Sequence, residues 1–484
     1  MQLRLFKLVL GPLVFLVIYL TGPYPGMSEE ALAVLASTGW IAVWWVTEAI
    51  PIAATSLLPI ILFPLTQGLD ISQTTASYGH RFVFLYIGGF MLAVAIEKWN
   101  LHRRIALNVI RIIGTSPDKM ILGFMIATAF LSMWISNTAT TVMMLPIGMA
   151  IVVQFSEIID KGKLSLFSKA LMLGIAYSAS IGGISTLIGT PPNLVLAGAV
   201  ERFYGYEISF VSWFILVFPL SVIILFICWK YLTTLAYKLN EKGLEGTNEE
   251  ITRQLKALGK ISREEKIVLV VFSLTGLCWI SRPFLLEPFL PQVDDTIIGI
   301  TGALTLFLIP AKDDGFILDW EQAVKIPWGI ILLFGGGMAI ASGFQDSGLA
   351  EWIGNRMTGL DGLSIFLILI LVVMMVNFLT EITSNLATTA MLLPALAPTA
   401  LSLDVHPFLL MIGATIAASC AFMLPVATPP NAVVFGSGYL QVSDMFRKGL
   451  IMNLLSILLV SIYLYLMLPL VWGIDFTVFP EVWK

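Results

Sequence analysis

Apolar runs long enough to cross a lipid bilayer recur along the whole chain and restrict its fold more than any other feature. Hydrophobic residues make up 58% of the sequence and charged residues 12%, against about 45–50% and about 25% in a soluble domain. A helix needs about 20 apolar residues to span the hydrocarbon core, and its backbone groups are satisfied internally. The chain is therefore predicted to be an all-α integral membrane protein.

Basic residues predict the topology, because Lys and Arg concentrate in cytoplasmic loops. Arg4 and Lys7 assign the N-terminus to the cytoplasm, and the basic connections at 98–111, 156–169 and 237–266 mark later cytoplasmic segments. Between these connections the pattern predicts about eleven transmembrane helices and two re-entrant hairpins. The C-terminus is expected outside, and the protein in the cell's inner (plasma) membrane.

Three sequence elements occur twice in the same order, which indicates an internal repeat. Residues 136–146 read SNTATTVMMLP and residues 384–394 read SNLATTAMLLP. A Gly-Gly-Phe-Met stretch at 88–91 corresponds to Gly-Gly-Gly-Met at 335–338, and these glycines suggest close helix packing or local bends. A Thr-Pro-Pro-Asn stretch also occurs in each half. An odd number of spans in each half makes the repeat inverted, as is common in alternating-access transporters.

The predicted organisation follows from this repeat. Its segments are a first span and outer loop (1–30), a first inverted repeat (31–236), a cytoplasmic linker (237–265), a second inverted repeat (266–472) and an external C-terminal tail (473–484). Each repeat is expected to contain a hairpin tip, at 136–138 and 384–386, and a broken helix, at 188–193 and 427–431.

The Ser-Asn tips and the double prolines are expected to interrupt helices inside the membrane. Asn favours helix ends because its side chain bonds to local backbone groups, and two prolines remove two backbone donors. One such Ser or Asn is usually explained by hydrogen bonding between helices. Two copies of both elements indicate instead that four helix breaks converge on one site, because irregular backbone is tolerated only in a protein interior or a watery cavity.

The chemistry of such a site suits an anion and a small cation. Helix N-termini carry free N–H donors and partial positive charge, whereas exposed carbonyls and helix C-termini suit Na⁺. Lys and Arg are absent from the four motifs. Two similar tips facing each other suit a substrate with two similar ends, which favours a dicarboxylate.

The Ser-Asn tips, the Thr-Pro-Pro-Asn stretches and the segment WVTEAIP at 45–51 resemble the divalent anion/sodium symporter family. Members take up succinate, malate, fumarate and, in some cases, citrate or sulfate. The resemblance implies sodium-coupled uptake of C4-dicarboxylates. It also implies a homodimer in the membrane lipid, each protomer having a scaffold domain and a transport domain that moves as an elevator.

The resemblance further implies ligands for the substrate and for Na⁺. The implied sodium ligands are Ser132, Ser136, Asn137 and Gly189 in the first half, and Thr380, Thr383, Asn385 and Ala427 in the second. The substrate is expected to contact Asn137, Thr138, Thr190, Pro191, Ser384, Asn385, Thr428 and Pro429. Leu386 departs from the family pattern, which has Thr at this position of the second tip.

Two acidic residues near these motifs are candidates for function, because ionisable groups inside a membrane are usually functional. Glu48 lies in the WVTEAIP segment and Glu381 beside the second tip. Each carboxylate either bonds to backbone and hydroxyl groups or takes part in proton coupling or ion attraction. His80, His102 and His406 lie at predicted span ends and are interpreted as interfacial residues.

Other function classes fit the sequence less well. An intramembrane enzyme would need a nucleophile with a base, or a metal cluster, and no His lies near either tip. A channel is disfavoured because inverted pairs of broken helices build a closed central site. A sodium-independent dicarboxylate exchanger remains an alternative, as do citrate or sulfate as the substrate. No feature suggests binding of nucleic acid.

Overall fold

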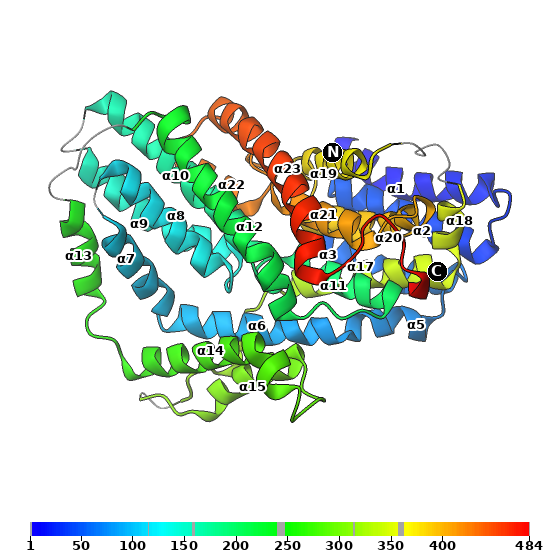
Figure 1. Cartoon of the computed structure of the whole chain (residues 1–484), viewed down its shortest axis with the longest axis horizontal. Helices are drawn as coiled ribbons and strands as arrows, with labels where there is room; N and C mark the ends of the chain where they lie inside the picture. Colours follow the sequence, from blue (N-terminus) through cyan, green and yellow to red (C-terminus); the bar gives the residue numbers. More distant parts are fainter. Residues whose placement is uncertain are drawn as a thin grey trace.

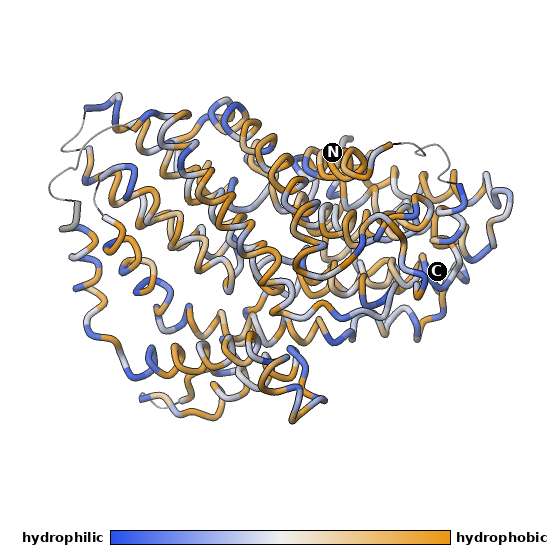
Figure 2. Tube along the Cα trace, in the orientation of Figure 1, coloured by the Kyte–Doolittle hydropathy of each residue, from blue (hydrophilic) through white to orange (hydrophobic). Residues whose placement is uncertain are grey.

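The computed structural model describes residues 2–114, 116–156, 160–239, 247–312, 315–356 and 363–483. In these ranges all regular elements are helices, apart from an isolated bridge between Pro310 and Phe316. Nine of the described helices or helix runs are long and apolar enough to cross a membrane, and four shorter apolar helices accompany them. Figure 2 shows hydrophobic residues along most of the helices and hydrophilic residues mainly near their ends.

The first half of the chain contains a run of spans, a hairpin and a broken helix. Its helices are α1 (Gln2–Thr21), α2 (Glu29–Thr47), α3 (Ile52–Thr55), α4 (Leu58–Leu65), α5 (Ile71–Ala76), η1 (Ser77–Gly79), α6 (Arg81–Lys98), α7 (Leu101–Ile113), α8 (Pro117–Ser132), α9 (Asn137–Phe155), α10 (Lys161–Gly183), α11 (Pro191–Tyr204), α12 (Phe210–Lys230) and η2 (Tyr231–Ala236). The helices α3 and α4 are two short pieces separated by Ser56 and Leu57.

The second half repeats the order of hairpin, broken helix and long helix. Its elements are α14 (Arg263–Ser281), η3 (Arg282–Leu286), α15 (Asp295–Leu308), α16 (Trp320–Ala323), α17 (Trp328–Asp346), α18 (Leu349–Gly354), α19 (Ile365–Thr380), α20 (Asn385–Ser402), α21 (Pro407–Ser419), α22 (Pro429–Phe435), α23 (Val442–Trp472) and η4 (Glu481–Trp483). The pairs α8–α9 and α19–α20 turn at the two Ser-Asn motifs, as expected from the sequence.

The two halves interlock through their broken helices. In the first half, α10 packs against both arms of its own hairpin, α8 and α9, and in the second half α21 packs against α19 and α20. The short helices after each break cross to the other half, because α22 contacts α9 and α10 while α11 contacts α20 and α21. Both breaks therefore lie between the two hairpins. A separate layer of α6, α14 and α15 runs along the lower side of Figure 1.

Glycines permit the closest helix contacts, as the Gly-Gly stretches predicted. A Cβ built at Gly88 of α6 would lie 2.7 Å from the Gly299 carbonyl carbon of α15, and one at Gly336 of α17 would lie 2.6 Å from the Ser56 carbonyl oxygen. Any larger residue at these positions would push the helices apart, so Gly is required for packing there.

The predicted linker 237–265 contains α13 (Thr247–Ala257) and the first residues of α14, which begins at Arg263, while residues 240–246 lie outside the described part of the chain. Arg104 of α7 fixes the end of the linker. Its guanidinium forms two hydrogen bonds with Glu265, at 2.9 and 3.0 Å, and donates to the carbonyl oxygens of Leu258 and Gly259.

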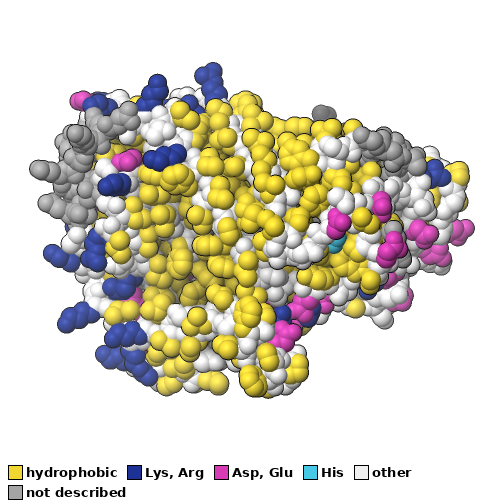
Figure 3. All heavy atoms as spheres, in the orientation of Figure 1, with side chains coloured by type: hydrophobic (Ala, Val, Ile, Leu, Met, Phe, Trp, Pro, Cys, Tyr) yellow, Lys and Arg dark blue, Asp and Glu magenta, His cyan; other side chains and the backbone are white. Residues whose placement is uncertain are grey.

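On the face seen in Figure 3, Lys and Arg gather at the left end and Asp and Glu at the right.

Candidate functional site

The first hairpin tip is built around Asn137, the first residue of α9. Ser136 caps this helix by accepting a hydrogen bond from the Ala139 amide at 3.2 Å. Behind the tip, Ser132 Oγ lies 2.6 Å from Asn137 Oδ1 and 2.7 Å from the carbonyl oxygen of Ala179 on α10. The Asn137 oxygen is thus held from inside the protein, which leaves its N–H groups for a ligand.

The second tip reproduces the hydroxyl–amide contact around Asn385, whereas the Ser384 side chain makes no capping hydrogen bond with α20. Thr380 Oγ1 lies 2.7 Å from Asn385 Oδ1 and 2.9 Å from the carbonyl oxygen of Ala418 on α21. Thr380 and Asn385 stand 248 positions after Ser132 and Asn137, the same offset as the two motifs. A hydroxyl, an amide oxygen and a carbonyl therefore meet in the same way at both tips.

The two helix breaks lie slightly earlier than the sequence suggested. The chain leaves α10 after Gly183 and α21 after Ser419, and each Pro-Pro pair begins the next helix. This placement suits proline, because the first turn of a helix has no acceptor for its N–H groups and a fixed φ is favourable there. The unwound segments are therefore 184–190 and 420–428 rather than 188–193 and 427–431.

An asparagine after each Pro-Pro pair holds the unwound segment in place. Asn193 Nδ2 donates to the carbonyl oxygens of Gly183, Ile184 and Thr186, the last at 2.7 Å. Asn431 Nδ2 donates in the same way to Ala421 and Leu424. Both asparagines are fully buried. Each break is consequently a fixed structure, and the Asn of the Thr-Pro-Pro-Asn stretch has a structural role that the sequence alone did not identify.

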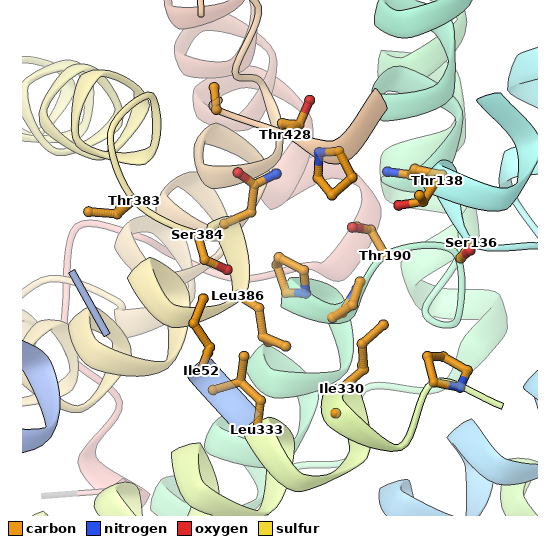
Figure 4. Close-up of a pocket in the computed structure, with 18 of the residues that line it drawn as sticks. Ile52, Ser136, Thr138, Thr190, Ile330, Leu333, Thr383, Ser384, Leu386 and Thr428 are labelled. Atoms are coloured by element: carbon orange, nitrogen blue, oxygen red, sulfur yellow. The ribbon is translucent and has the colours of Figure 1, made fainter. Parts of the chain in front are cut away.

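The tips and the breaks line one cavity of about 970 Å³. All but two of the predicted ligands contribute to its wall: Ser136, Asn137, Thr138, Gly189, Thr190, Pro191, Thr383, Ser384, Asn385, Ala427, Thr428 and Pro429. The exceptions, Ser132 and Thr380, are fully buried behind the tips. Figure 4 shows Ser384 and Leu386 on one side of this cavity and Ser136 and Thr138 on the other.

Helix N-termini converge on this cavity. The helices α9, α11 and α20 begin at Asn137, Pro191 and Asn385, which all lie in its wall. The first N–H groups of a helix have no partner within it, and the helix dipole adds partial positive charge. At α11 only the dipole contributes, because Pro191 and Pro192 have no N–H and the Asn193 amide donates to the Thr190 carbonyl oxygen at 3.2 Å. An anion in the cavity would thus be held by backbone donors and asparagine amides rather than by basic side chains.

The wall opposite the tips was not predicted. It comes from α3 and the start of α17, with Ile52, Ala53, Ile330 and Leu333 in the cavity wall. Their apolar side chains carry no signal of a binding role. The neighbouring WVTEAIP segment was the available clue, because Thr47, Glu48 and Pro51 also line the cavity. Lys7 Nζ donates to the Thr47 carbonyl at 2.8 Å and supplies the one basic group in the described wall.

Leu386 and the two acidic candidates have separate environments. Leu386 lines the cavity but is only 5% exposed. Glu48 also lines the cavity and ends α2 in the left-handed conformation, with φ of 47°. Glu381 is buried and accepts hydrogen bonds from the Phe422, Met423 and Leu424 amides and from Asn453. Of the alternatives for Glu381, these contacts favour bonding to the backbone.

Charged residues tie the far end of α11 to the layer of α6, α14 and α15. Arg81 contacts Glu201 at 2.7 Å and Glu207 at 3.1 Å, and Arg282 contacts Glu207 at 2.8 Å. Burial raises the pKa of Glu207, but Arg81 and Arg282 outweigh burial and bring that pKa below its ordinary value.

The three histidines lie apart from the cavity. His80 and His406 cap α6 and α21, and the His102 ring contacts the Ile96 carbonyl.

Two re-entrant hairpins and two broken helices around one cavity, within a multi-pass helical protein, define a secondary membrane transporter. The chain belongs to the family described as the sodium:sulfate symporter transmembrane region, whose model matches residues 2–474. It is a family of transporters and not of enzymes.

Relatives at high identity cover nearly the whole chain. The sodium-dependent dicarboxylate transporter SdcS of Staphylococcus saprophyticus is 47% identical over 483 residues, which cover 98% of this chain and 93% of the relative. SdcS of Staphylococcus aureus strain USA300 is 46% identical over 481 residues, covering 98% and 92%.

Solved structures share the fold at low sequence identity. The Alcanivorax borkumensis YdaH transporter aligns with a TM-score of 0.60 at 12% identity, covering 92% of this chain and 99% of that one. Neisseria gonorrhoeae MtrF aligns with a TM-score of 0.56 at 14% identity, covering 96% and 95%.

Proposed function

We propose that this protein takes up C4-dicarboxylates such as succinate, malate and fumarate together with Na⁺. The observation that carries the proposal is the convergence of helix N-termini and two asparagine amides on one cavity whose described wall holds a single basic side chain. The names of the SdcS relatives, which specify sodium and dicarboxylate, support the same substrate and ion.

Each half is proposed to hold one Na⁺ beside its tip. The first site would use the oxygens of Ser132, Ser136, Asn137 and Gly189, and the second those of Thr380, Thr383, Asn385 and Ala427. The matched hydroxyl–amide contacts of 2.6 Å and 2.7 Å support this assignment, because they gather oxygen atoms at equivalent positions. The substrate would lie between the tips and contact Asn137, Thr138, Thr190, Pro191, Ser384, Asn385, Thr428 and Pro429.

The mechanism is proposed to be alternating access by an elevator movement in a homodimer. The hairpins with α10–α12 and α21–α23 would form the transport domain, and the remaining spans, including α6, α14 and α15, the scaffold. The layer of α6, α14 and α15 supports the division, because these helices pack mainly on one another, whereas α7, α17 and α18 of the scaffold border the hairpins and α11. The chain would lie in the cell's inner (plasma) membrane with a cytoplasmic N-terminus, a proposal that Arg4, Lys7 and the basic connections of the sequence support.

Uptake into proteoliposomes tests the proposal. Labelled succinate should enter when an inward Na⁺ gradient is present and should not accumulate when choline replaces sodium. Inhibition by unlabelled malate, fumarate, citrate and sulfate then ranks the substrates. Equal uptake in sodium and choline, with rapid counterflow, would instead identify a sodium-independent exchanger.

A further inference from the structure

A second cavity, of about 320 Å³, lies where α7, α9 and α13 meet. Its wall is formed by Arg103 of α7, Met143, Pro146 and Ile147 of α9, and Gln254 of α13. The volume falls within the range of about 300–1,000 Å³ that is usual for ligand sites. None of these residues borders the transport cavity, although α9 reaches both sites.

The polar side of this cavity offers one cation and one acceptor. Its cation is Arg103, which is exposed and forms no ion pair in the described part of the chain, whereas the neighbouring Arg104 is committed to Glu265. The acceptor is Gln254: its Nε2 donates to Glu250 at 2.9 Å, but its Oε1 is buried and lacks a partner among the described residues. A buried acceptor without a donor is costly, so a ligand that brings an O–H or N–H is favoured there.

The other side of the cavity continues onto an apolar flank of α9. Val142 and Val153 are 53% and 58% exposed, and Pro146 between them is also exposed. These positions recur at helical spacing on one face, as expected for a face in contact with lipid chains. Figure 3 shows Lys and Arg side chains beside hydrophobic ones at the end of the molecule where Figure 1 places α7 and α13.

We propose that this cavity binds one anionic phospholipid whose headgroup carries a hydroxyl, such as phosphatidylglycerol. Arg103 holds the phosphate, because a guanidinium matches phosphate geometry. The headgroup hydroxyl donates to Gln254 Oε1, and an acyl chain lies along Met143, Pro146 and Ile147. A soluble phosphate would leave that apolar wall uncovered, which is why a lipid is the occupant. Since α9 begins at the first Ser-Asn tip and carries the cavity residues near its middle, the lipid contacts a hairpin of the transport site directly.

Lipid binding to the purified full-length protein in detergent, followed by native mass spectrometry, tests this site. Three lipids with the same acyl chains separate its parts: phosphatidylglycerol, phosphatidylmethanol, which is anionic but has no headgroup hydroxyl, and phosphatidylcholine. Wild-type protein should retain one phosphatidylglycerol in preference to one phosphatidylcholine. Phosphatidylmethanol should bind with intermediate affinity.

Two substitutions assign the preference to named side chains. Arg103→Gln should weaken phosphatidylglycerol binding about fivefold, which corresponds to about 1 kcal/mol for one basic side chain at an anionic surface. Arg111→Gln is the matched control, because Arg111 is exposed on the same helix but does not line the cavity, and it should leave binding unchanged. Gln254→Leu should abolish only the preference for phosphatidylglycerol over phosphatidylmethanol.

Three outcomes would overturn the proposal. The site is wrong if Arg103→Gln and Arg111→Gln have the same effect, and the charge argument is wrong if phosphatidylcholine binds as well as phosphatidylglycerol. Displacement of the lipid by soluble glycerol phosphate at equal concentration would identify a site for a soluble anion instead.

Discussion

Gly183 is the position where a single added methyl group tests the role of Asn137. A Cβ at Gly183 would lie 2.4 Å from Asn137 Oδ1 and 2.9 Å from Nδ2, whereas ordinary van der Waals contact begins at 3.4 Å. In Gly183→Ala the amide must therefore move by about 1 Å. That movement separates Asn137 Oδ1 from Ser132 Oγ, which now lie 2.6 Å apart.

The expected loss is one net hydrogen bond in the proposed first sodium site, or about 0.5–1.5 kcal/mol. A loss of 1 kcal/mol corresponds to about a fivefold change in an equilibrium constant. We expect Gly183→Ala to raise the Na⁺ concentration that half-activates succinate uptake by about fivefold or more. Succinate uptake by proteoliposomes, measured over a series of Na⁺ concentrations, provides this value.

Gly276→Ala of α14 is the control for a glycine replaced within a helix. Its Cβ would meet only Trp134, at 3.8 Å, and Ala is favoured over Gly in a helix by about 1 kcal/mol. This variant should retain the wild-type sodium dependence and the wild-type melting temperature, or a slightly higher one. If Gly183→Ala lowers the melting temperature while uptake keeps the wild-type Na⁺ dependence, the proposal that Asn137 binds Na⁺ is refuted.

Two further substitutions test the second half of the site. Leu386→Thr adds a hydroxyl to the cavity wall and should change the relative affinities for succinate, malate, citrate and sulfate by about 0.5–1.5 kcal/mol; unchanged competition profiles would show that Leu386 does not face the substrate. Glu381→Ala removes the acceptor of the Met423 and Leu424 amides, and each unsatisfied amide should cost about 1–3 kcal/mol of unfolding free energy. Thermal denaturation measures this cost, and a wild-type melting temperature would contradict it.

The hairpins and the tips were predictable because their signals are local and occur twice. Ser136 and Asn137 begin a helix after an apolar arm, and Ser384 and Asn385 do the same, so each motif indicated a turn between two helices. Close packing at Gly88 also followed from small residues in an apolar run, whereas its partner Gly299 was known only from the structure. Dimerisation, the inversion of the repeat and the elevator movement remain predictions.

Other features depend on contacts that no single segment contains. The wall at Ile330 and Leu333 consists of ordinary apolar residues whose position follows only from how α17 packs against the hairpins. The bonding of Glu381 to the segment after α21 joins residues about 40 positions apart, so the sequence left its role open. The start of α11 at Pro191 was not predictable either, because a double proline can follow the end of one helix or begin the next, and only the structure shows which occurs here.

Reciprocal coupling between Na⁺ and dicarboxylate tests the central claim most directly, namely that each Ser-Asn tip holds both ligands. The affinity for succinate is measured at several Na⁺ concentrations, and the affinity for Na⁺ at several succinate concentrations, on purified wild-type, Asn137→Ala and Asn385→Ala proteins. In the wild type, the factor by which Na⁺ raises the affinity for succinate must equal the factor by which succinate raises the affinity for Na⁺, because coupling between binding free energies is reciprocal. Both substitutions should weaken both ligands and reduce the coupling while the melting temperature without ligand stays near that of the wild type. Normal binding of both ligands by a destabilised protein would contradict the claim, because the two asparagines would then only connect helices.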